Sequence, residues 1–395
     1  MQERRYDLDW LRIIAILLLH LFHCAMPFVA EWDWHLKNKE TSNLLLEFNY
    51  FLSRWRMPLL FFISGAGTWF VLQHAATGQY IWQRTKRLFI PLIFGMLVVV
   101  PPQIFFERIY KGAAYNSILE FYPSIFTTGP YPAGNMSWHH LWFIAYLFLY
   151  AIIGIPLFVF LKSGKGKKLT DTVARFCEKF GMLWFAVLLF IASFLYIWFP
   201  SETHALVDDW ATFTRYFLFF IFGYFIGVHA GFWKTIESNR RRHLAIAFFG
   251  FILINYLRWN DKEPEWGFNA GNFMYIGLRI ISAWSIILAL LGYAKKYLNL
   301  NKKILAFTNE GIYPFYILHQ TFIVITTFYV IQVEETIISK YLFTTVISFV
   351  LSVGFYVFLI RPYRITRFLF GMKQTSTKKH KPLQEPTGKT LFALF

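Results

Sequence analysis

The sequence predicts an all-α fold, namely a polytopic membrane bundle of about ten transmembrane helices with both termini in the cytoplasm. Of the 395 residues, 56% are hydrophobic and 21% aromatic, whereas only 15% are charged. The mean hydropathy of +0.43 is far above that of an ordinary soluble domain. The apolar residues are also gathered in long runs. A helix crosses a bilayer with about 20 such residues, because lipid offers the backbone no hydrogen-bond partners.

This rule predicts spans along the whole chain, with boundaries that are loose by several residues. The predicted spans cover residues 9–30, 45–72, 88–106, 139–161, 182–199, 211–230, 243–258, 273–294, 311–331 and 341–360. They lie in one predicted membrane domain, residues 1–370, and residues 371–395 form a basic tail that we expect to be flexible. No connection is long enough for a soluble catalytic domain. Any chemistry is therefore expected within the bundle or its loops.

The formal net charge of +17 is explained by topology rather than by nucleic-acid binding. Most basic residues fall in the N-terminus, in every second loop and in the tail, which together lie on one side of the membrane. The positive-inside rule assigns this side to the cytoplasm. The clusters are Arg4–Arg12, Arg84–Arg87, Lys162–Lys179, Lys234–Arg242, Lys295–Lys303 and Arg361–Lys389. We therefore expect the lipid bilayer as a partner and no nucleic acid.

The first span, DWLRIIAILLLHLFHCAM, contains Arg12, His20 and His23. We expect it to be a retained first helix rather than a cleaved secretory signal, because the hydrophobic region of such a signal does not contain arginine or histidines. At about 100° per residue, Arg12 and His23 share a helix face, roughly 16 Å apart along the axis, whereas His20 is rotated by about 80°. Arg12 either belongs to a site or merely snorkels or pairs with Asp9. An ionisable residue inside a membrane is costly, which favours a functional role for His23 over hydrogen bonding to neighbouring helices.

Other spans also contain polar residues. The second carries Arg56 within SRWRMPLLFFISG, and the ninth carries Tyr316, His319 and Gln320 on one face of NEGIYPFYILHQTF. Further examples are Arg54, Ser64, His139, His140, Arg215 and Arg279. Together they predict a wet cavity that favours anions. The alternative is that Pro314 merely kinks the ninth span and the tyrosines serve packing.

Five sequence pieces resemble the acyltransferase-3 family of integral membrane acyltransferases. They are the Arg12/His23 spacing, FFISG, QRTKRLFIP, HLWF and YPFYILHQ, and they occur in the family's order between Tyr6 and Arg367. Within the family, RMPLLFFISG and PLIFGMLVVVPPQ are most similar to the glucan biosynthesis protein C branch, which is associated with succinylation of periplasmic glucans.

The resemblance implies a membrane O-acyltransferase of the bacterial cytoplasmic (inner) membrane. Its donor substrate would be a cytoplasmic acyl-CoA carrying an acetyl or succinyl group. Its acceptor would be a hydroxyl of an extracytoplasmic carbohydrate, such as a periplasmic glucan or a surface polysaccharide. Arg12 and His23 correspond to the family's essential pair. His23 would act as general base on the hydroxyl or would itself carry the acyl group.

Further roles follow for other cations. Arg56 is a candidate for holding an acyl carboxylate or the oxyanion of the intermediate, and His319 for titrating or orienting the site. Together with Arg12, the cytoplasmic Arg84, Lys86 and Arg87 are candidates for binding the coenzyme A phosphates. The simpler interpretation of the three loop cations is that membrane topology alone requires them.

We expect no permanently bound cofactor and no metal, because the sequence has neither HExxH nor CxxC spacing, and no ATP-binding loop. Some relatives carry a fused hydrolase domain that completes the transfer. Without it, we expect direct transfer or handover to separate glycan-synthesis proteins. The alternative function is a transporter or flippase for a glycan or lipid-linked sugar, whose buried charges would line a path. A regulatory scaffold is a third candidate.

Overall fold

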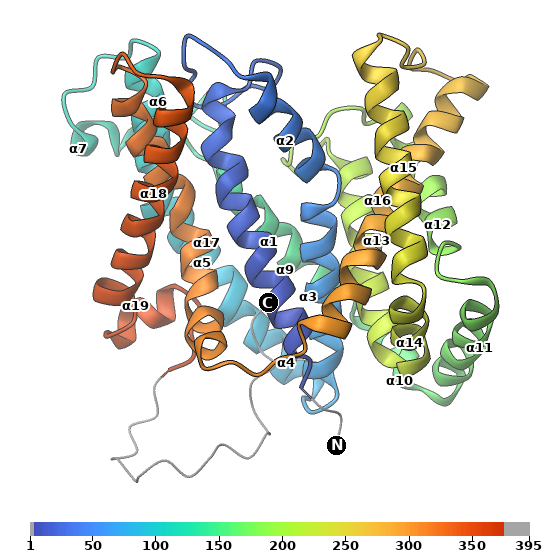
Figure 1. Ribbon diagram of the computed structural model, residues 1–395. Helices are drawn as coiled ribbons and strands as arrows, with labels where there is room; N and C mark the ends of the chain where they lie inside the picture. Colours follow the sequence, from blue (N-terminus) through green and yellow to red (C-terminus); the bar gives the residue numbers. More distant parts are fainter. Residues whose placement is uncertain (1–3, 375–395) are drawn as a thin grey trace.

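The computed structural model describes residues 4–374 and shows a bundle of helices (Figure 1). Within these residues no β-strand forms, and the one isolated bridge joins Pro130 to Met136 in a loop. The predicted all-α polytopic bundle is therefore confirmed. The predicted tail, residues 371–395, lies outside the described part of the chain except for its first four residues.

Six stretches of the described chain are long and apolar enough to cross a membrane, and two bent helix pairs raise this to eight if each pair is one span. The six are Tyr6–Phe28, Asn43–Leu72, Thr77–Tyr110, Trp210–Val228, Ala270–Tyr297 and Ile337–Ile360, and the pairs are His139–Ile153 with Ile155–Lys162 and Gly164–Phe180 with Phe185–Ile197. The other two predicted spans form helices α15 (Arg240–Trp259) and α17 (Lys303–Val330), which do not meet the same requirement. The predicted number of about ten is therefore not confirmed.

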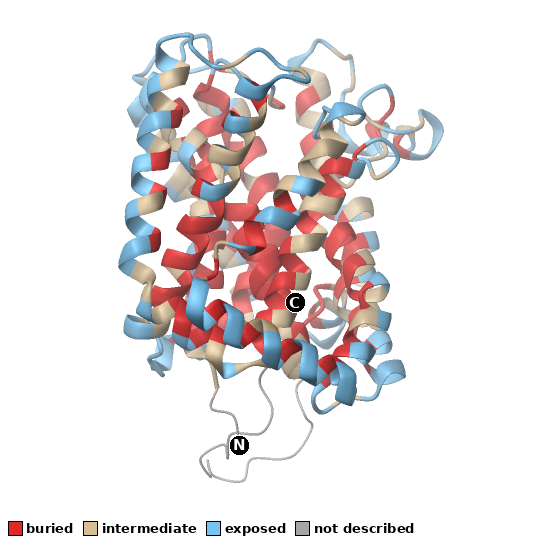
Figure 2. Cartoon of the chain, turned by 90° about the vertical axis from the view of Figure 1, so that its right-hand side faces the viewer, coloured by how far each residue is buried: buried red, intermediate tan, exposed pale blue. Residues whose placement is uncertain are grey.

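Helix α1 (Tyr6–Ala25) lies inside the bundle. It packs against α3 (Arg56–Leu72), α16 (Ala270–Tyr297), α17 and α18 (Ile337–Phe355). Figure 2 shows buried residues through the middle of the bundle and exposed ones on its outer helices and at its ends. Polar side chains on α1 are thus removed from lipid and water alike, so they need partners from the neighbouring helices.

Two glycines allow α3 to approach α13 (Trp210–Val228) closely. A methyl group added at Gly65 would lie 1.8 Å from the carbonyl oxygen of Phe220, and one at Gly223 would lie 1.9 Å from that of Phe62. Small residues at such crossings let backbones touch, which replaces the hydrophobic driving force that helices lack in lipid. This contact fixes α3, whose first residue is Arg56.

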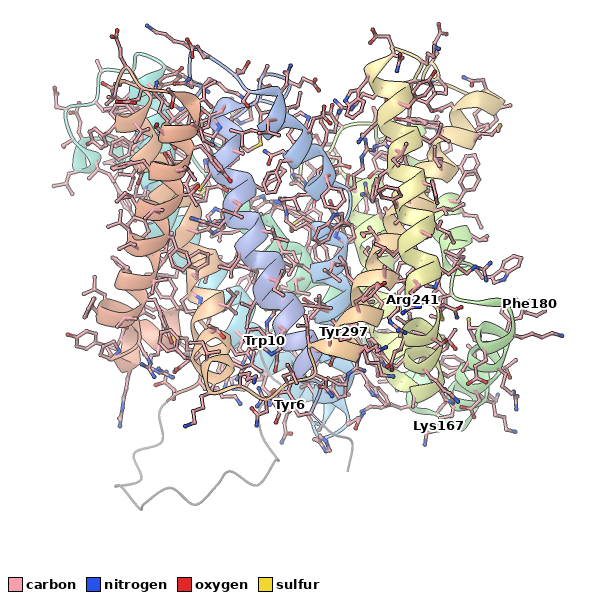
Figure 3. The ribbon with its side chains drawn as sticks, viewed as in Figure 1. Tyr6, Trp10, Lys167, Phe180, Arg241 and Tyr297 are labelled. Atoms are coloured by element: carbon pink, nitrogen blue, oxygen red, sulfur yellow. The ribbon has the colours of Figure 1, made fainter. Side chains whose placement is uncertain are left out.

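Within residues 4–374, the basic clusters of the sequence gather at one end of the bundle, called here the basic end. It carries the start of α1, α4 (Thr77–Arg84), α11 (Gly164–Phe180) and α14 (Ala230–Ser238). In Figure 3, Tyr6, Lys167 and Tyr297 lie toward this end. The opposite end carries α6 (Pro101–Tyr110), α7 (Ile118–Phe121) and α8 (Ser124–Thr127). That the basic end faces the cytoplasm stays a prediction of the positive-inside rule.

We predict that Gly65→Ala strongly destabilises the protein, because its methyl group would displace the α13 backbone. The apparent melting temperature in detergent should fall by at least several degrees, as overpacking costs about 1–3 kcal/mol or more. The matched control is Gly354→Ala on α18, where an added methyl group meets nothing within 4 Å. Equal melting temperatures for the two variants would contradict the close α3–α13 contact.

Candidate active site

Arg12 is buried near the basic end of α1, and it has polar partners there. Its guanidinium lies 3.2 Å from a carboxylate oxygen of Asp9 and donates a hydrogen bond of 2.6 Å to Asn309 of α17. Asp9 is also paired with Arg4 at 3.0 Å. The pairing with Asp9 that the sequence left open is therefore present. Arg12 does not lie beside His23, since the helix rise separates them by roughly 16 Å.

His23 lies near the other end of α1 and faces His319 of α17. The two side chains are 8% and 0% exposed. Their rings are nearly parallel, and Nδ1 of His23 lies 3.0 Å from Nε2 of His319. The structure thus brings together two of the predicted site residues, which are separated by 296 positions in the sequence.

The tautomers of this pair follow from the partner of the second ring nitrogen of His319. Its Nδ1 lies 2.6 Å from the carbonyl oxygen of Tyr316, and a carbonyl can only accept, so Nδ1 carries the proton. In neutral His319 the Nε2 atom is then an acceptor, and Nδ1–H of His23 donates to it. Nε2 of His23 is left with a free electron pair, which is the form that a general base or nucleophile requires.

Two further histidines surround the pair and are held by backbone carbonyls. Nε2 of His140 donates to Ile317 at 3.0 Å, and Nε2 of His20 donates to Thr345 at 3.1 Å. Their rings lie 5.3 Å and 6.1 Å from the ring of His319. Each of these histidines therefore commits one N–H to the bundle, which fixes its ring around the site.

Arg56, at the first turn of α3, is a buried cation next to the histidine pair. It is 5% exposed, its guanidinium lies 3.8 Å from the ring centre of Phe22, and it interacts electrostatically with both His23 and His319. Its Nε and Nη1 atoms have no hydrogen-bond partner among the described residues. A buried guanidinium in this state is suited to an anion or to an oxygen that gains negative charge.

The three predicted phosphate-binding cations lie at the basic end but differ in their surroundings. Arg84 is buried, donates to Thr68 at 3.1 Å and covers the ring of Tyr80. Lys86 and Arg87 lie in a π-helical turn, η2 (Thr85–Phe89). Within the described chain, Nη1 of Arg87 is buried and has no hydrogen-bond partner. Arg87 is therefore more available to a ligand than Arg84, which already has protein partners.

Sequence analysis missed several polar residues that complete the surroundings of the histidine pair. Trp34 packs its ring 5.2 Å from that of His23, and His35 follows it in the loop after α1. His35 is joined to Glu107 of α6 by a contact of 2.5 Å. Asn309 had a sequence signal, because it begins the motif NEGIYPFYILHQTF that also contains His319. Trp34 and His35 had no such signal, because the residues that they contact are distant in sequence.

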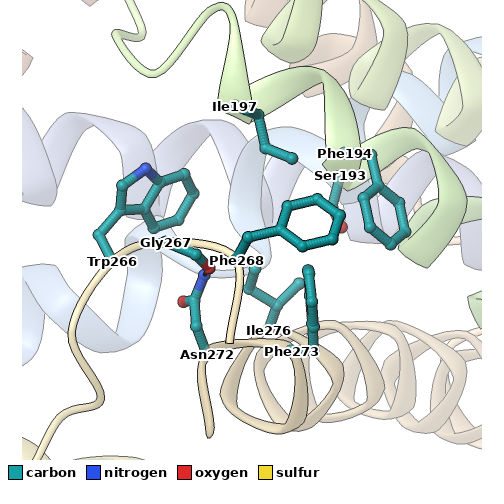
Figure 4. A pocket seen from close by; sticks show the side chains of 9 residues that line it. All are labelled: Ser193, Phe194, Ile197, Trp266, Gly267, Phe268, Asn272, Phe273 and Ile276. Carbon is teal, nitrogen blue, oxygen red and sulfur yellow. Dashed lines mark hydrogen bonds between the residues drawn. The ribbon is translucent and has the colours of Figure 1, made fainter. Parts of the chain in front are cut away.

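A small apolar pocket of about 90 Å³ lies elsewhere, between α12 (Phe185–Ser193), η5 (Phe194–Ile197) and the start of α16 (Figure 4). Its walls include Phe194, Trp266 and Phe268, and they include none of the predicted site residues. Trp266 and Phe268 are 56% and 80% exposed. Exposed aromatic residues of this kind are typical of the membrane–water interface.

Comparison with known protein families agrees with the resemblance in the sequence. The acyltransferase domain family matches residues 5–357, which is most of the chain. The chain belongs to this family. The histidine pair, Arg56 and Arg12 all lie within the matched region.

Curated relatives carry the name glucans biosynthesis protein C. The protein of Escherichia coli strain SMS-3-5 / SECEC is 27% identical over 159 residues, and that of strain K12 is 26% identical over the same length. These matches cover 40% of this chain and 39% of each relative. No solved structure matches this chain.

We predict that Arg56→Met abolishes acyl transfer without lowering stability. Methionine has a similar length, and it removes a buried charge that lacks a counterion, so the melting temperature should stay constant or rise. Transfer should fall by about 10²–10³-fold if the guanidinium stabilises developing negative charge. Arg215→Met is the control, because Arg215 is paired with Glu202 at 3.2 Å. A destabilised Arg56→Met with native specific activity would contradict this role.

Proposed function

We propose that this acyltransferase moves an acetyl or succinyl group from a cytoplasmic acyl-CoA to hydroxyls of an extracytoplasmic carbohydrate, such as a periplasmic glucan or a surface polysaccharide. It would do so as a multi-pass protein of a bacterial inner membrane. The family and the printed name of the curated relatives support this proposal. The observation that carries it is the hydrogen bond of 3.0 Å between His23 and His319.

In the reaction that we propose, Nε2 of His23 removes the proton of the attacking sugar hydroxyl. The hydroxyl oxygen forms a bond to the thioester carbonyl, and the carbonyl oxygen becomes an oxyanion that faces Arg56. Collapse of this intermediate breaks the carbon–sulfur bond. The protonated His23 returns the proton to the leaving thiolate, which gives the sugar ester and free coenzyme A.

His319 is a positioning residue in this scheme, because it acts through His23. By accepting the Nδ1–H of His23, it keeps the electron pair on Nε2 and stabilises the ring when His23 becomes protonated. The carboxylate of a Ser-His-Asp triad has the same two effects on its histidine. The acyl-histidine route also uses Nε2 of His23, so the same pair serves either order of steps.

On the donor side, we propose that the nucleotide of the acyl-CoA binds at the basic end. Arg87 offers a guanidinium N–H that has no partner among the described residues, and Lys86 lies beside it. Guanidinium groups match phosphate oxygens in geometry and charge. The acyl-bearing end of the bound acyl-CoA would then extend along α1, from the level of Arg12 to that of His23.

We predict that His23→Ala abolishes labelling of an added glucan by right-side-out membrane vesicles loaded with labelled acetyl-CoA or succinyl-CoA. Loss of a general base or nucleophile lowers the rate by about 10²–10⁴-fold or more. The donor that labels the glucan identifies the acyl group. Equal labelling by native protein and variant at matched expression would remove His23 from catalysis. Substrate movement without acylated product would favour the transporter alternative.

His319 is tested by two substitutions that differ in hydrogen-bonding capacity. His319→Leu should lower kcat by about 10²-fold, because His23 loses the acceptor for its Nδ1–H. His319→Gln should recover part of this loss, since its amide oxygen can accept the same proton. Native kcat in His319→Leu, or no difference between the two folded variants, would contradict the positioning role.

The donor side is tested with Arg87→Ala. It should raise KM for acyl-CoA about 10-fold and leave kcat within about twofold, because a phosphate contact is made equally in the ground and transition states. Lys303→Ala is the control, since Lys303 is exposed at the same end. If both variants show the native KM, the coenzyme does not bind at Arg87.

A further inference from the structure

A network of buried amide and imidazole groups continues from His319 toward the opposite end of the bundle. Its centre is Gln320, the next residue on α17, which is 3% exposed. The side-chain nitrogen of Gln320 lies 3.2 Å from Oε1 of Gln103 and 3.1 Å from Nε2 of His35. Both contacts determine which way the amide of Gln320 points.

The contact with Gln103 is fixed by a chain of hydrogen bonds. The hydroxyl of Thr321 donates to the carbonyl of Val99 at 2.7 Å, so its oxygen accepts from the side-chain nitrogen of Gln103, also at 2.7 Å. Gln103 therefore presents its oxygen to Gln320. An oxygen accepts only, so the atom of Gln320 that faces it is the NH₂ group.

In the neutral form of His35, its contact with Gln320 is consistent with the same orientation. Nδ1 of His35 donates to Oε2 of Glu107 at 2.5 Å, while Lys111 and Tyr131 donate to Oε1 of the same carboxylate at 2.6 and 3.0 Å. Three donors are the partners of an ionised carboxylate. With its proton on Nδ1, neutral His35 offers an electron pair at Nε2, which again calls for the NH₂ group of Gln320.

The side-chain oxygen of Gln320 is thus turned away from both His35 and Gln103. This Oε1 atom is buried and has no hydrogen-bond partner among the described residues. Nε1 of Trp34 is likewise buried without a partner in residues 4–374. Trp34 packs against the rings of both His23 and His35, at 5.2 and 4.9 Å. One unpaired acceptor, on Gln320, and one unpaired donor, on Trp34, therefore lie on side chains that both contact His35, and Trp34 also contacts His23.

We propose that Gln320 and Trp34 bind the hydroxyl groups of the carbohydrate substrate beside His23. A hydroxyl both donates and accepts, so it can donate to Oε1 of Gln320 and accept from Nε1–H of Trp34, which are the two capacities left open. Leaving such buried groups unpaired is costly, and a polar ligand removes that cost. This inference rests on the proposed function, because it assigns the sugar to the side of His23 away from the basic end. Glu107 and His35 act as positioning residues for Gln320.

The test compares KM for glucan with KM for acyl-CoA in Gln320→Met and Trp34→Phe. Methionine is similar in length to glutamine and removes both hydrogen-bonding atoms of its amide, and phenylalanine keeps an aromatic ring but removes the Nε1–H of tryptophan. KM for glucan should rise about tenfold, while KM for acyl-CoA stays within about twofold. The matched control is Gln332→Met, because Gln332 is exposed just beyond the end of α17. It should keep the native values.

The positioning of Gln320 by Glu107 and His35 is tested with the substitutions Glu107→Leu and Glu107→Gln. Leucine cannot accept the Nδ1–H of His35, so KM for glucan should rise as in Gln320→Met. Glutamine can accept it and should restore most of the native KM. A loss confined to folding would not respond to this conservative change.

The outcomes separate this inference from the proposed function. If His23→Ala still acylates glucan, the proposed function fails, whatever Gln320 does. If His23 is required but Gln320→Met and Trp34→Phe keep the native KM for glucan, the two atoms bind water only and the sugar-site inference is overturned. Should one variant fail to fold, the other decides, since the two residues lie on different elements.

Discussion

The contact between α1 and α17 is the interaction on which the rest of the site depends. These helices are far apart in sequence, yet they are cross-linked twice by buried polar side chains, Arg12 to Asn309 and His23 to His319. The two linked residues are 11 positions apart on α1 and 10 on α17. Nearly equal spacings, increasing in the same direction along both helices, are what two parallel helices produce. Each link therefore supports the register that the other needs.

The two buried arginines near this contact differ in whether a carboxylate balances their charge. Arg12 lies 3.2 Å from a carboxylate, so its charge is balanced within the protein, and it anchors the basic end of α1. Arg56 lies against the ring of Phe22 and has two N–H groups without partners among the described residues. Removing a charge from water without a counterion is costly. In the proposed reaction Arg56 faces the oxyanion, which would offset that cost.

Long apolar runs predicted the helical class, and helix periodicity predicted that Arg12 shares a face with His23 and that Tyr316, His319 and Gln320 share a face of their own span. These are local properties, because a helix of 3.6 residues per turn decides them by itself. The structure buries all three of the α17 residues. Whether His23 and His319 act as proposed stays a prediction that the arrangement itself does not test.

The partners of these residues were not predictable, because they come from elements that are far apart in sequence. Periodicity does not reveal that Asn309 receives Arg12. It also does not reveal that Arg84, expected in a cytoplasmic loop to bind phosphate, is buried against Thr68 and Tyr80. The number of spans is not confirmed either. The apolar runs of the sequence predict spans at α15 and α17, but these two helices are not among the candidate spans of the structure.

The orientation of Gln320 shows how buried hydrogen bonds can direct chemistry over several residues. Neither nitrogen nor oxygen of an amide is preferred by shape, so its partners alone decide which atom faces which neighbour. Here the hydroxyl of Thr321 sets the choice through Gln103, and the contact with His35, which Glu107 holds, is consistent with it. In the proposed reaction, the donor approaches His23 from the basic end, and the unpaired oxygen of Gln320 lies on the other side. The two substrates would then meet at Nε2 of His23 without competing for the same polar groups, which is what transfer across a membrane requires.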